Sequence, residues 1–268
     1  MAASTFQFDS EIAPSDADAS GVRLSGAPPA EKSGPLASRS VRSLTEDDLT
    51  VVFQPIVDLS TRRIFAHEVL VRCTVDEFTS PTVLFERAVQ EDACGRLGRN
   101  IRKVAFASAP KGLPMFVNLH PHELVSRWLV RPDDPIYFHD GPVFLEITES
   151  AAIEYFDLCS SVLKEVCWRS GAGLAVDDFG AGHANVTRVL DLSPGVVKLD
   201  RALIQGLDTN HRKQIIVTHL VAMCHSLGAS VVVEGIETLD ELKAVADTGA
   251  RYAQGFVFGR PSMIPQGG

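Results

Sequence analysis

Short apolar runs in this sequence repeatedly end on, or next to, side chains that can bind a metal ion or move a proton. Helix-length segments separate most of the runs, a pattern typical of parallel strands that alternate with helices. The carboxyl ends of such strands meet at one mouth of a barrel. Crowded carboxylates repel one another, so the pattern predicts a site that binds cations. The side chains are His67, Glu68, Asn118, Glu146, Asp177, Asp178, Lys198, Glu234 and Gln254.

Eight strands are expected, and most are followed by a helix-length segment. Their order predicts an α/β fold, a TIM-like (β/α)8 barrel. Only about six residues, 58–63, join the first two strands, which is too short for a crossover helix. A hairpin is therefore expected there, with one strand antiparallel to its neighbour. The expected strands are residues 51–57, 64–71, 115–119, 143–147, 173–176, 196–199, 230–233 and 252–257.

Residues that are typical of helix starts and helix ends predict where the helices lie. Ser80-Pro81 is typical of a helix start and leads into an amphipathic segment through residue 109. Further helices are expected over 149–170 and 201–227, each followed by glycine. Thr238 and Glu241 form the sequence of a capping box that opens a last helix ending near Gly249. Thr45 and Asp48 resemble the same kind of helix start.

The amino-terminal residues differ in composition from the rest. Residues 1–45 are rich in Ala, Ser, Pro, Gly and Asp and show no sustained periodicity, so we expect a disordered tail. The alternative is a tail that binds a partner or directs targeting. The barrel domain is then expected to span residues 46–268.

Charge and cysteine usage exclude several classes of function. The net charge of −9 argues against duplex nucleic acid as a partner, because phosphate backbones are bound through basic surfaces. The five cysteines form no C-x-x-C pair, which predicts free thiols in a reducing compartment. The apolar stretches are too short to span a bilayer, and no signal peptide is evident. We therefore expect a cytoplasmic protein that does not enter a membrane.

Eight motifs follow one another from about residue 51 to 261. They are Phe53-Gln-Pro-Ile56, His67-Glu-Val-Leu-Val-Arg72, Val117-Asn-Leu119, Leu145-Glu-Ile-Thr-Glu149, Asp177-Asp-Phe-Gly180, Val197-Lys-Leu-Asp200, Val233-Glu-Gly-Ile-Glu-Thr238 and Gln254-Gly-Phe256. Their order resembles that of one known family, the EAL domains, which are cyclic di-GMP phosphodiesterases. One such tripeptide would be weak evidence, but eight in the family's order are strong evidence.

The resemblance implies hydrolysis of one phosphodiester of cyclic di-GMP to linear pGpG, with Mg²⁺ or Mn²⁺ in a two-metal site. It implies that Asp177 bridges the two ions and that Lys198 holds the attacking water. Lys198, Glu234 and Glu68 are accordingly the expected catalytic residues. The expected metal ligands are Glu68, Asn118, Glu146, Asp177, Asp178 and Glu234.

Other roles follow from the same resemblance. Gln54, Arg72 and Gln254 are expected to bind the substrate. Glu149 is expected to brace the loop after Asp178, and Glu237 to support the pocket. We expect Asp200 to hold Lys198 or a loop. The family also implies a homodimer, and a regulatory protein partner could dock on the tail or the barrel surface.

The chemistry of the residues is consistent with this assignment. Carboxylate and amide oxygens, without thiolate, suit Mg²⁺ or Mn²⁺. An ion pair with Arg or Lys is the alternative reading, but it accounts for only one or two of the carboxylates. His67 is left out of the site because its side chain alternates with that of Glu68 and faces the helices. His120, His122 and His183 are expected in loops.

Two stretches depart from the family pattern. The segment after Arg72 is shorter than usual, and the loop after Asp178 lacks the usual hydroxyl residues. These departures sustain an alternative from the binding class: a weakly active or inactive EAL domain that acts as a cyclic di-GMP receptor or as a protein-docking module. A barrel phosphohydrolase for another phosphodiester is the other alternative, since fold alone does not settle substrate.

Overall fold

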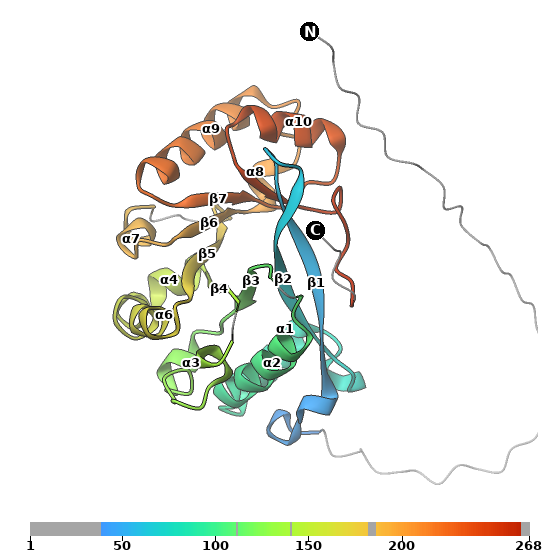
Figure 1. Cartoon of the computed structure of the whole chain (residues 1–268), viewed down its shortest axis with the longest axis vertical. Helices are drawn as coiled ribbons and strands as arrows, with labels where there is room; N and C mark the ends of the chain where they lie inside the picture. The colour runs from blue at the N-terminus through green and yellow to red at the C-terminus, as the bar shows by residue number, and fades with distance from the viewer. Residues whose placement is uncertain (1–38, 111, 140, 182–185, 264–268) are drawn as a thin grey trace, which may run out of the picture. The chain divides into compact units, whose positions relative to one another are not determined.

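A computed structural model of the protein describes residues 39–110, 112–139, 141–181 and 186–263 (Figure 1). In these residues eight strands close into a barrel in sequence order, which confirms the expected TIM-like fold. The helices lie outside the barrel (Figure 1). The strands are β1 (Leu49–Asp58), β2 (Arg63–Cys73), β3 (Met115–Asn118), β4 (Val143–Thr148), β5 (Gly173–Phe179), β6 (Val196–Leu199), β7 (Ser230–Val233) and β8 (Tyr252–Gln254).

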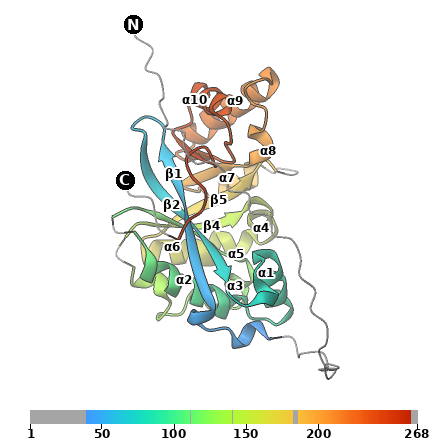
Figure 2. The ribbon, with the colours of Figure 1, turned by 90° about the vertical axis from the view of Figure 1, so that its right-hand side faces the viewer.

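The antiparallel strand predicted from the short first connection is β1. It runs antiparallel to β2 on one side and to β8 on the other, while the remaining neighbours in the barrel pair in parallel. The β1–β2 hairpin runs along one side of the barrel (Figure 2). Asp58 closes its turn by accepting hydrogen bonds from the backbone N–H groups of Ser60 and Thr61, at 2.8 and 3.0 Å.

Strand alternation fills the barrel with two layers of opposite character. Side chains two residues apart on a strand share a face, so each strand contributes one residue to each layer. The lower layer, here called the apolar plug, is formed by Ile56, Ala66, Phe116, Ala175, Val196, Val232 and Tyr252, with Phe65 and Phe144 packed against it. The layer above it, toward the carboxyl ends of the parallel strands, is formed by Gln54, Glu68, Asn118, Glu146, Asp177, Lys198, Glu234 and Gln254.

The helices cover the outer face of the barrel. Their contacts with the strands form a larger apolar core, which includes Val69, Val117 and Leu145 from the outward faces of three strands. The helices are α1 (Pro81–Gln90), α2 (Cys94–Ser108), α3 (His122–Val125), α4 (Glu149–Glu154), α5 (Phe156–Leu158), α6 (Lys164–Ser170), α7 (Val186–Asp191), α8 (Arg201–Ile204), α9 (His211–Ser226) and α10 (Leu239–Asp247).

Three helices expected to be continuous are interrupted, so those predictions were wrong in that respect. The segment 81–109 breaks between α1 and α2, where Asp92 has a φ of 49°. The segment 149–170 contains α4, α5, a π-helical turn over Cys159–Leu163 and α6. The segment 201–227 divides into α8 and α9. Sequence periodicity continues through these breaks, which is why it did not reveal them.

The predicted helix ends are in place. α6 stops at Gly171, which takes the left-handed conformation with a φ of 74°. The capping box of α10 is formed by Thr238 and Glu241, as expected. The last strand is shorter than predicted and ends at Gln254, because the chain turns at Gly255, whose carbonyl accepts from the Phe258 N–H at 3.1 Å.

The described residues begin just ahead of β1. Val41 and Leu44 are buried against Leu84 and Leu97 of α1 and α2. Thr45 and Asp48 form the expected capping arrangement, with the Thr45 N–H donating to the Asp48 carboxylate at 2.8 Å. Of the segment expected to be a disordered tail, residues 1–38 lie outside the described residues.

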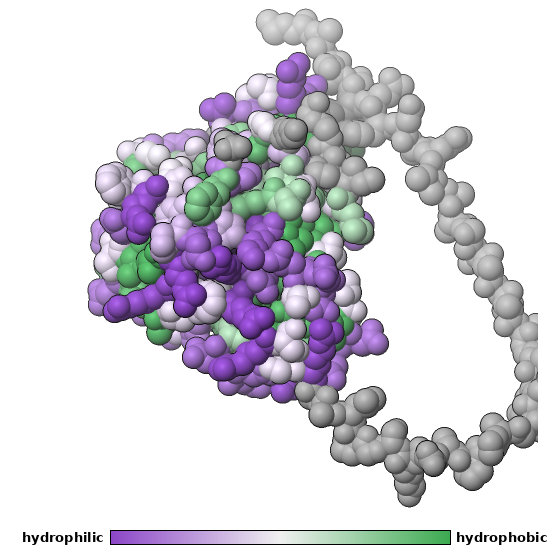
Figure 3. All heavy atoms as spheres, turned by 60° about the horizontal axis from the view of Figure 1, so that its bottom comes forward, coloured by the Kyte–Doolittle hydropathy of each residue, from purple (hydrophilic) through white to green (hydrophobic). Residues whose placement is uncertain are grey.

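The exterior is mainly polar on the face shown in Figure 3, where hydrophobic residues form small separate areas. Among the residues that the structure describes, no helix combines the length and the apolar character needed to cross a membrane.

A buried ion network fixes α2 against the following loops. The Arg102 guanidinium donates to both oxygens of Asp134, at 3.0 and 2.7 Å, and to Glu123 at 2.6 Å. All three side chains are at most 1% exposed. Desolvation opposes the charge on Arg102, but its two carboxylate partners raise its pKa above the ordinary value. The network therefore depends on the presence of all three charges.

Replacing Arg102 by methionine leaves two buried carboxylates without a cation. The variant Arg102→Met is expected to lower the free energy of unfolding by about 3–5 kcal/mol, measured by urea denaturation. Arg99→Met is the matched control on the same helix. Arg99 pairs with Asp133, which is 64% exposed, so a loss below about 1 kcal/mol is expected. Equal losses in the two variants would contradict the assigned role of the network.

Candidate active site

Lys198 lies at the centre of the polar layer, where four strands bring carboxylates to it. Its Nζ is 2.7 Å from Glu146 and 2.7 Å from Glu234. Asp177 and Glu68 follow at 3.3 and 3.6 Å. These residues, predicted from separate motifs, are thus brought together by the barrel. The ion pair considered as an alternative exists, but one ammonium group faces four carboxylates.

Burial removes water from the charged groups of this cluster and so disfavours their charged forms. Glu146 is fully buried and Lys198 is 1% exposed. Desolvation, opposed by Lys198 and reinforced by Glu68 and Asp177, raises the pKa of Glu146 well above its ordinary value. Desolvation lowers the pKa of Lys198, but the surrounding carboxylates outweigh it and raise that pKa well above normal. The lysine is therefore charged, and the carboxylates are the groups in need of further cations.

A backbone irregularity aims two neighbouring aspartates at the same site. Adjacent strand residues normally face opposite sides, so Asp177 and Asp178 should diverge. Asp178 instead has a φ of 55°, and the pairing of β5 with β6 shifts register between Val176 and Phe179. The Asp178 N–H donates to the Asp177 carboxylate at 2.9 Å. The bulge is the reason that both aspartates reach the cluster.

The carboxylates form two groups that share one member. Oxygens of Glu68, Glu146 and Asp177 lie within 4.8 Å of one another, and so do oxygens of Asp177, Asp178 and Glu234. Fully ionised, these five carboxylates and the Lys198 ammonium leave four negative charges (five minus one), the charge that two divalent cations neutralise. An all-oxygen donor set suits Mg²⁺ or Mn²⁺. The residues therefore fit two such ions, one for each set of three carboxylates, and Asp177 belongs to both sets.

Two amides orient Glu68. The Gln254 Nε2 donates to one oxygen of the carboxylate at 2.6 Å, and the Asn118 Nδ2 donates to the other at 3.2 Å. Among the described residues, the buried Oε1 of Gln254 has no hydrogen-bond partner. An oxygen in that position is suited to a ligand, which agrees with the fit of cations to the cluster.

The three supporting residues hold loops at the mouth. Glu149 accepts a hydrogen bond from the Gly180 N–H at 2.9 Å, just after Asp178. Asp200 caps α8 by accepting from the Ala202 N–H at 2.7 Å. Glu237 pairs with Arg201 at 2.8 Å. Asp200 was expected to hold either Lys198 or a loop, and the structure shows that it holds the loop at the start of α8.

Two cavities open at this end of the barrel. The first, about 290 Å³, is lined by the acidic cluster together with Gln54 and Gln254. The second, about 660 Å³, is lined by Arg72 and Asn118 from β2 and β3. The predicted substrate-binding residues are therefore divided between the cavities. Asn118 connects them, because its side chain lines the second cavity and contacts Glu68 in the first.

Sequence reasoning missed some lining residues. Arg201 and Phe256 line the acidic cavity; Arg201 was not named, and Phe256 was named only as the end of a motif, without a role. Arg201 directly follows the Lys198 motif and could have been found from that position. The part of the altered loop at residues 182–185 lies outside the described residues. His67, which was not assigned to the site, is buried on the outer face beside Phe53.

Comparison with known proteins identifies the family. The family profile of the EAL domain matches residues 38–261, which is most of the sequence. The chain belongs to the EAL family.

Curated relatives of this EAL domain include named enzymes. The cyclic di-GMP phosphodiesterase RocR of Pseudomonas aeruginosa is 30% identical over 247 residues, covering 85% of this chain and 61% of RocR. An uncharacterised protein of Azorhizobium caulinodans is 31% identical over 84% of this chain and 33% of its own length. The chain thus spans one third to three fifths of the length of these relatives.

Solved structures share the fold. Klebsiella pneumoniae BlrP1 in complex with calcium and cyclic di-GMP is 31% identical with a TM-score of 0.70, covering 80% of this chain and 56% of BlrP1. A manganese complex of BlrP1 at pH 6 gives 32% identity and a TM-score of 0.68 over the same shares. The EAL domain of Mycobacterium smegmatis DcpA gives 25% and 0.65, covering 80% of this chain and 93% of that one.

Metal affinity of this EAL domain is expected to rise with pH. Desolvation, opposed by Lys198 and reinforced by Asp177, raises the pKa of Glu234 to about 8, and desolvation together with Asp177 raises that of Asp178 to about 6. Both carboxyls are protonated below these values and must lose the proton to bind a cation. Calorimetry in buffers of different ionisation enthalpy should show proton release on Mn²⁺ binding. Equal affinity at pH 5.5 and pH 9 would contradict the assignment.

Proposed function

We propose that this EAL domain hydrolyses one phosphodiester of cyclic di-GMP to linear pGpG with two Mg²⁺ or Mn²⁺ ions, and so lowers second-messenger signalling. The observation that carries the proposal is the presence of two sets of three carboxylates around the buried Lys198, with Asp177 common to both sets. The named relatives and the nucleotide complexes of BlrP1 support the choice of substrate. The full set of expected acidic residues favours hydrolysis over a receptor role.

Each of the two sets of carboxylates would hold one cation. Glu68, Glu146 and Asp177, with Asn118 beside Glu68, would hold the first ion. Asp177, Asp178 and Glu234 would hold the second. When bound, the pair of ions supplies Lewis-acid stabilisation to the entering and leaving oxygens of an in-line displacement.

Lys198 serves the attacking water. Its Nζ lies between Glu146 of the first set of carboxylates and Glu234 of the second. It can therefore hold the water oxygen and offset the negative charge that develops on the phosphoryl group. The new bond joins the water oxygen to phosphorus, and the bond from phosphorus to the ribose 3′ oxygen breaks. The 3′ oxygen takes up a proton, which balances the one that the attacking water loses, and leaves as the 3′ hydroxyl of pGpG.

Substrate binding would use both cavities. The scissile phosphodiester would lie in the acidic cavity, beside Gln54 and Gln254. Arg72 lines the adjoining larger cavity, where its planar guanidinium can bind a phosphate. The shared wall at Asn118 allows one dinucleotide to extend from one cavity into the other.

Assembly and context form a further part of the proposal and rest on the family resemblance. We propose that the domain forms a homodimer and acts in the cytoplasm. A regulatory protein would dock through the amino-terminal tail or the barrel surface. Size-exclusion chromatography with light scattering measures the oligomeric state directly.

Chromatographic detection of pGpG tests the proposed reaction. Purified protein with cyclic di-GMP and Mg²⁺ or Mn²⁺ is expected to give product. Glu68→Ala should abolish turnover because it removes a ligand held by Asn118 and Gln254. Glu86→Ala, at an exposed position of α1, is the matched control and should retain full activity. Turnover by Glu68→Ala equal to that of the control would reject the site.

The same assay separates the alternatives. Nucleotide binding without product in the unmodified protein would replace the proposal by a cyclic di-GMP receptor. Neither binding nor product would indicate a protein-docking module.

Lys198 can be tested separately from the ligands. Lys198→Ala is expected to bind Mn²⁺ still, because the carboxylates remain, while kcat falls roughly hundredfold or more. Lys243→Ala is the matched control, since Lys243 pairs with Asp240 on the surface. Manganese binding by calorimetry and steady-state kinetics give the two readouts. An unchanged kcat in Lys198→Ala would remove the lysine from the proposed mechanism.

A further inference from the structure

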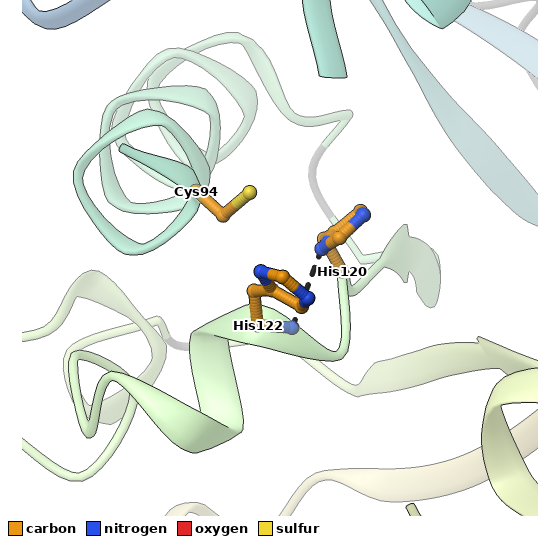
Figure 4. A group of neighbouring side chains, drawn as sticks. All are labelled: Cys94, His120 and His122. Carbon is orange, nitrogen blue, oxygen red and sulfur yellow. Dashed lines mark hydrogen bonds between the residues drawn. The ribbon is translucent and has the colours of Figure 1, made fainter. Parts of the chain in front are cut away.

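A second group of potential metal ligands lies outside the acidic cluster. Cys94 at the start of α2, His120 in the turn after β3 and His122 present a sulfur and two ring nitrogens within 4.8 Å of one another. His122, expected in a loop, is the first residue of α3. Figure 4 shows the Cys94 side chain pointing from its helix toward the two imidazole rings. Both histidines line the larger cavity, while Cys94 is buried beneath them.

The fold holds this group in place through close helix packing. A Cβ on Gly98 would lie 2.0 Å from the Glu123 carboxylate, so glycine is required for α3 to approach α2 this closely. Glu123 is fixed by Arg102 at 2.6 Å and accepts from the His120 N–H at 3.1 Å. The buried ion network therefore positions the turn that carries both histidines. Cys94 is one helical turn before Gly98, on the same face.

The ring of His120 is oriented by the backbone. Its Nδ1 accepts a hydrogen bond from the His122 N–H at 3.3 Å, which selects the tautomer with a lone pair at Nδ1 (Figure 4). The bond is long, so a metal ion can replace it at small cost. The other face of the ring stacks on Phe85, with centroids 5.7 Å apart. The two imidazoles are nearly perpendicular, at 79°, as two ligands of one ion can be.

We propose that Cys94, His120 and His122 bind one Zn²⁺ ion, with a fourth coordination position open to the larger cavity. One thiolate and two imidazoles form a donor set that suits zinc and does not suit Mg²⁺. Three protein ligands with one open position are typical of zinc sites that also bind water or a small ligand.

The geometry requires only a local contraction. Ligand atoms about 2.0–2.3 Å from a tetrahedral ion are roughly 3.6 Å apart, so the present separations of up to 4.8 Å close by about 1 Å. Rotation of the two partly exposed imidazoles supplies such a shift. Burial and the nearby carboxylates of Glu123 and Asp92 raise the pKa of the Cys94 thiol to about 11, so the ion displaces a proton when it binds.

The chemistry separates this site from the acidic cluster. The cluster around Lys198 contains oxygen donors only, whereas Cys94 contributes sulfur. Zinc at Cys94 would join α2 to the turn after β3, the strand that ends at Asn118. The proposal does not depend on hydrolysis of any nucleotide.

Cobalt absorption tests the proposal with a readout specific for sulfur. Co²⁺ bound by a thiolate gives a charge-transfer band in the near ultraviolet, and oxygen donors give none. The full chain is titrated with Co²⁺ in excess Mg²⁺, which competes for the carboxylates. One equivalent of Co²⁺ is expected to develop the band, and Zn²⁺ is expected to abolish it. Absence of the band would overturn the proposal.

Matched variants assign the ligands. Cys94→Ser should remove the band, whereas Cys167→Ser, at another free and partly buried thiol, should leave it unchanged. His120→Gln and His122→Gln should each weaken Zn²⁺ binding at least about tenfold, and exposed His225→Gln should not. A band that survives in Cys94→Ser, or that is lost in Cys167→Ser, would refute the assignment.

A measurement on the unmodified protein guards against misfolded variants. X-ray absorption of the Zn²⁺-loaded chain should show one sulfur at about 2.3 Å and nitrogens at about 2.0 Å from the ion. A first shell of oxygen alone would mean that the three side chains only line the cavity wall, and would overturn the zinc site.

Discussion

The desolvated charge around Lys198 is the constraint on which the rest of the barrel depends. Each parallel strand must place an apolar side chain in the plug and, two residues later, a polar side chain in the layer above it; in the antiparallel β1 the order is reversed, with Gln54 before Ile56. A carboxylate such as Glu146 is tolerated there only because Lys198 is 2.7 Å away. Regular strand alternation thus provides both the packed plug and the polar layer, and a slip of one residue in any strand would turn both of its inward side chains to the outer face.

The protein uses buried ions in two different ways. Arg102 faces two carboxylates in a compact arrangement with short hydrogen bonds to both, which leaves a residual charge of one. Lys198 is in contact with four carboxylates, so the charge there is far from balanced. The first arrangement holds helices and loops in position, whereas the second leaves an excess of negative charge at the mouth of the barrel. The two networks differ in their ratio of cation to carboxylates, which is one to two around Arg102 and one to four around Lys198.

Most of the barrel and the membership of the acidic cluster could be predicted from sequence, since both follow from strand alternation and from motifs within single strands. The short connection between β1 and β2 was enough to predict that one strand is antiparallel, and the structure shows that this strand is β1. The helix break at Asp92 and the bulge at Asp178 could not be predicted, because each rests on a left-handed residue that is not glycine. The proximity of Cys94 and His120 could not be predicted from the sequence either, since it results from packing between distant segments.

The reversed direction of β1 determines where the chain enters the barrel. Leu49, its first residue, pairs with Cys73, the last residue of β2, so the strand starts at the end where the parallel strands finish. In a barrel made only of parallel strands, the chain would enter at the opposite end, away from the chemistry. Here β1 begins at the end that carries the acidic cluster, and the Arg39 N–H donates at 2.9 Å to Glu77, just after β2. The described segment that leads into β1 is therefore anchored at the polar end of the barrel and not at the end closed by the apolar plug.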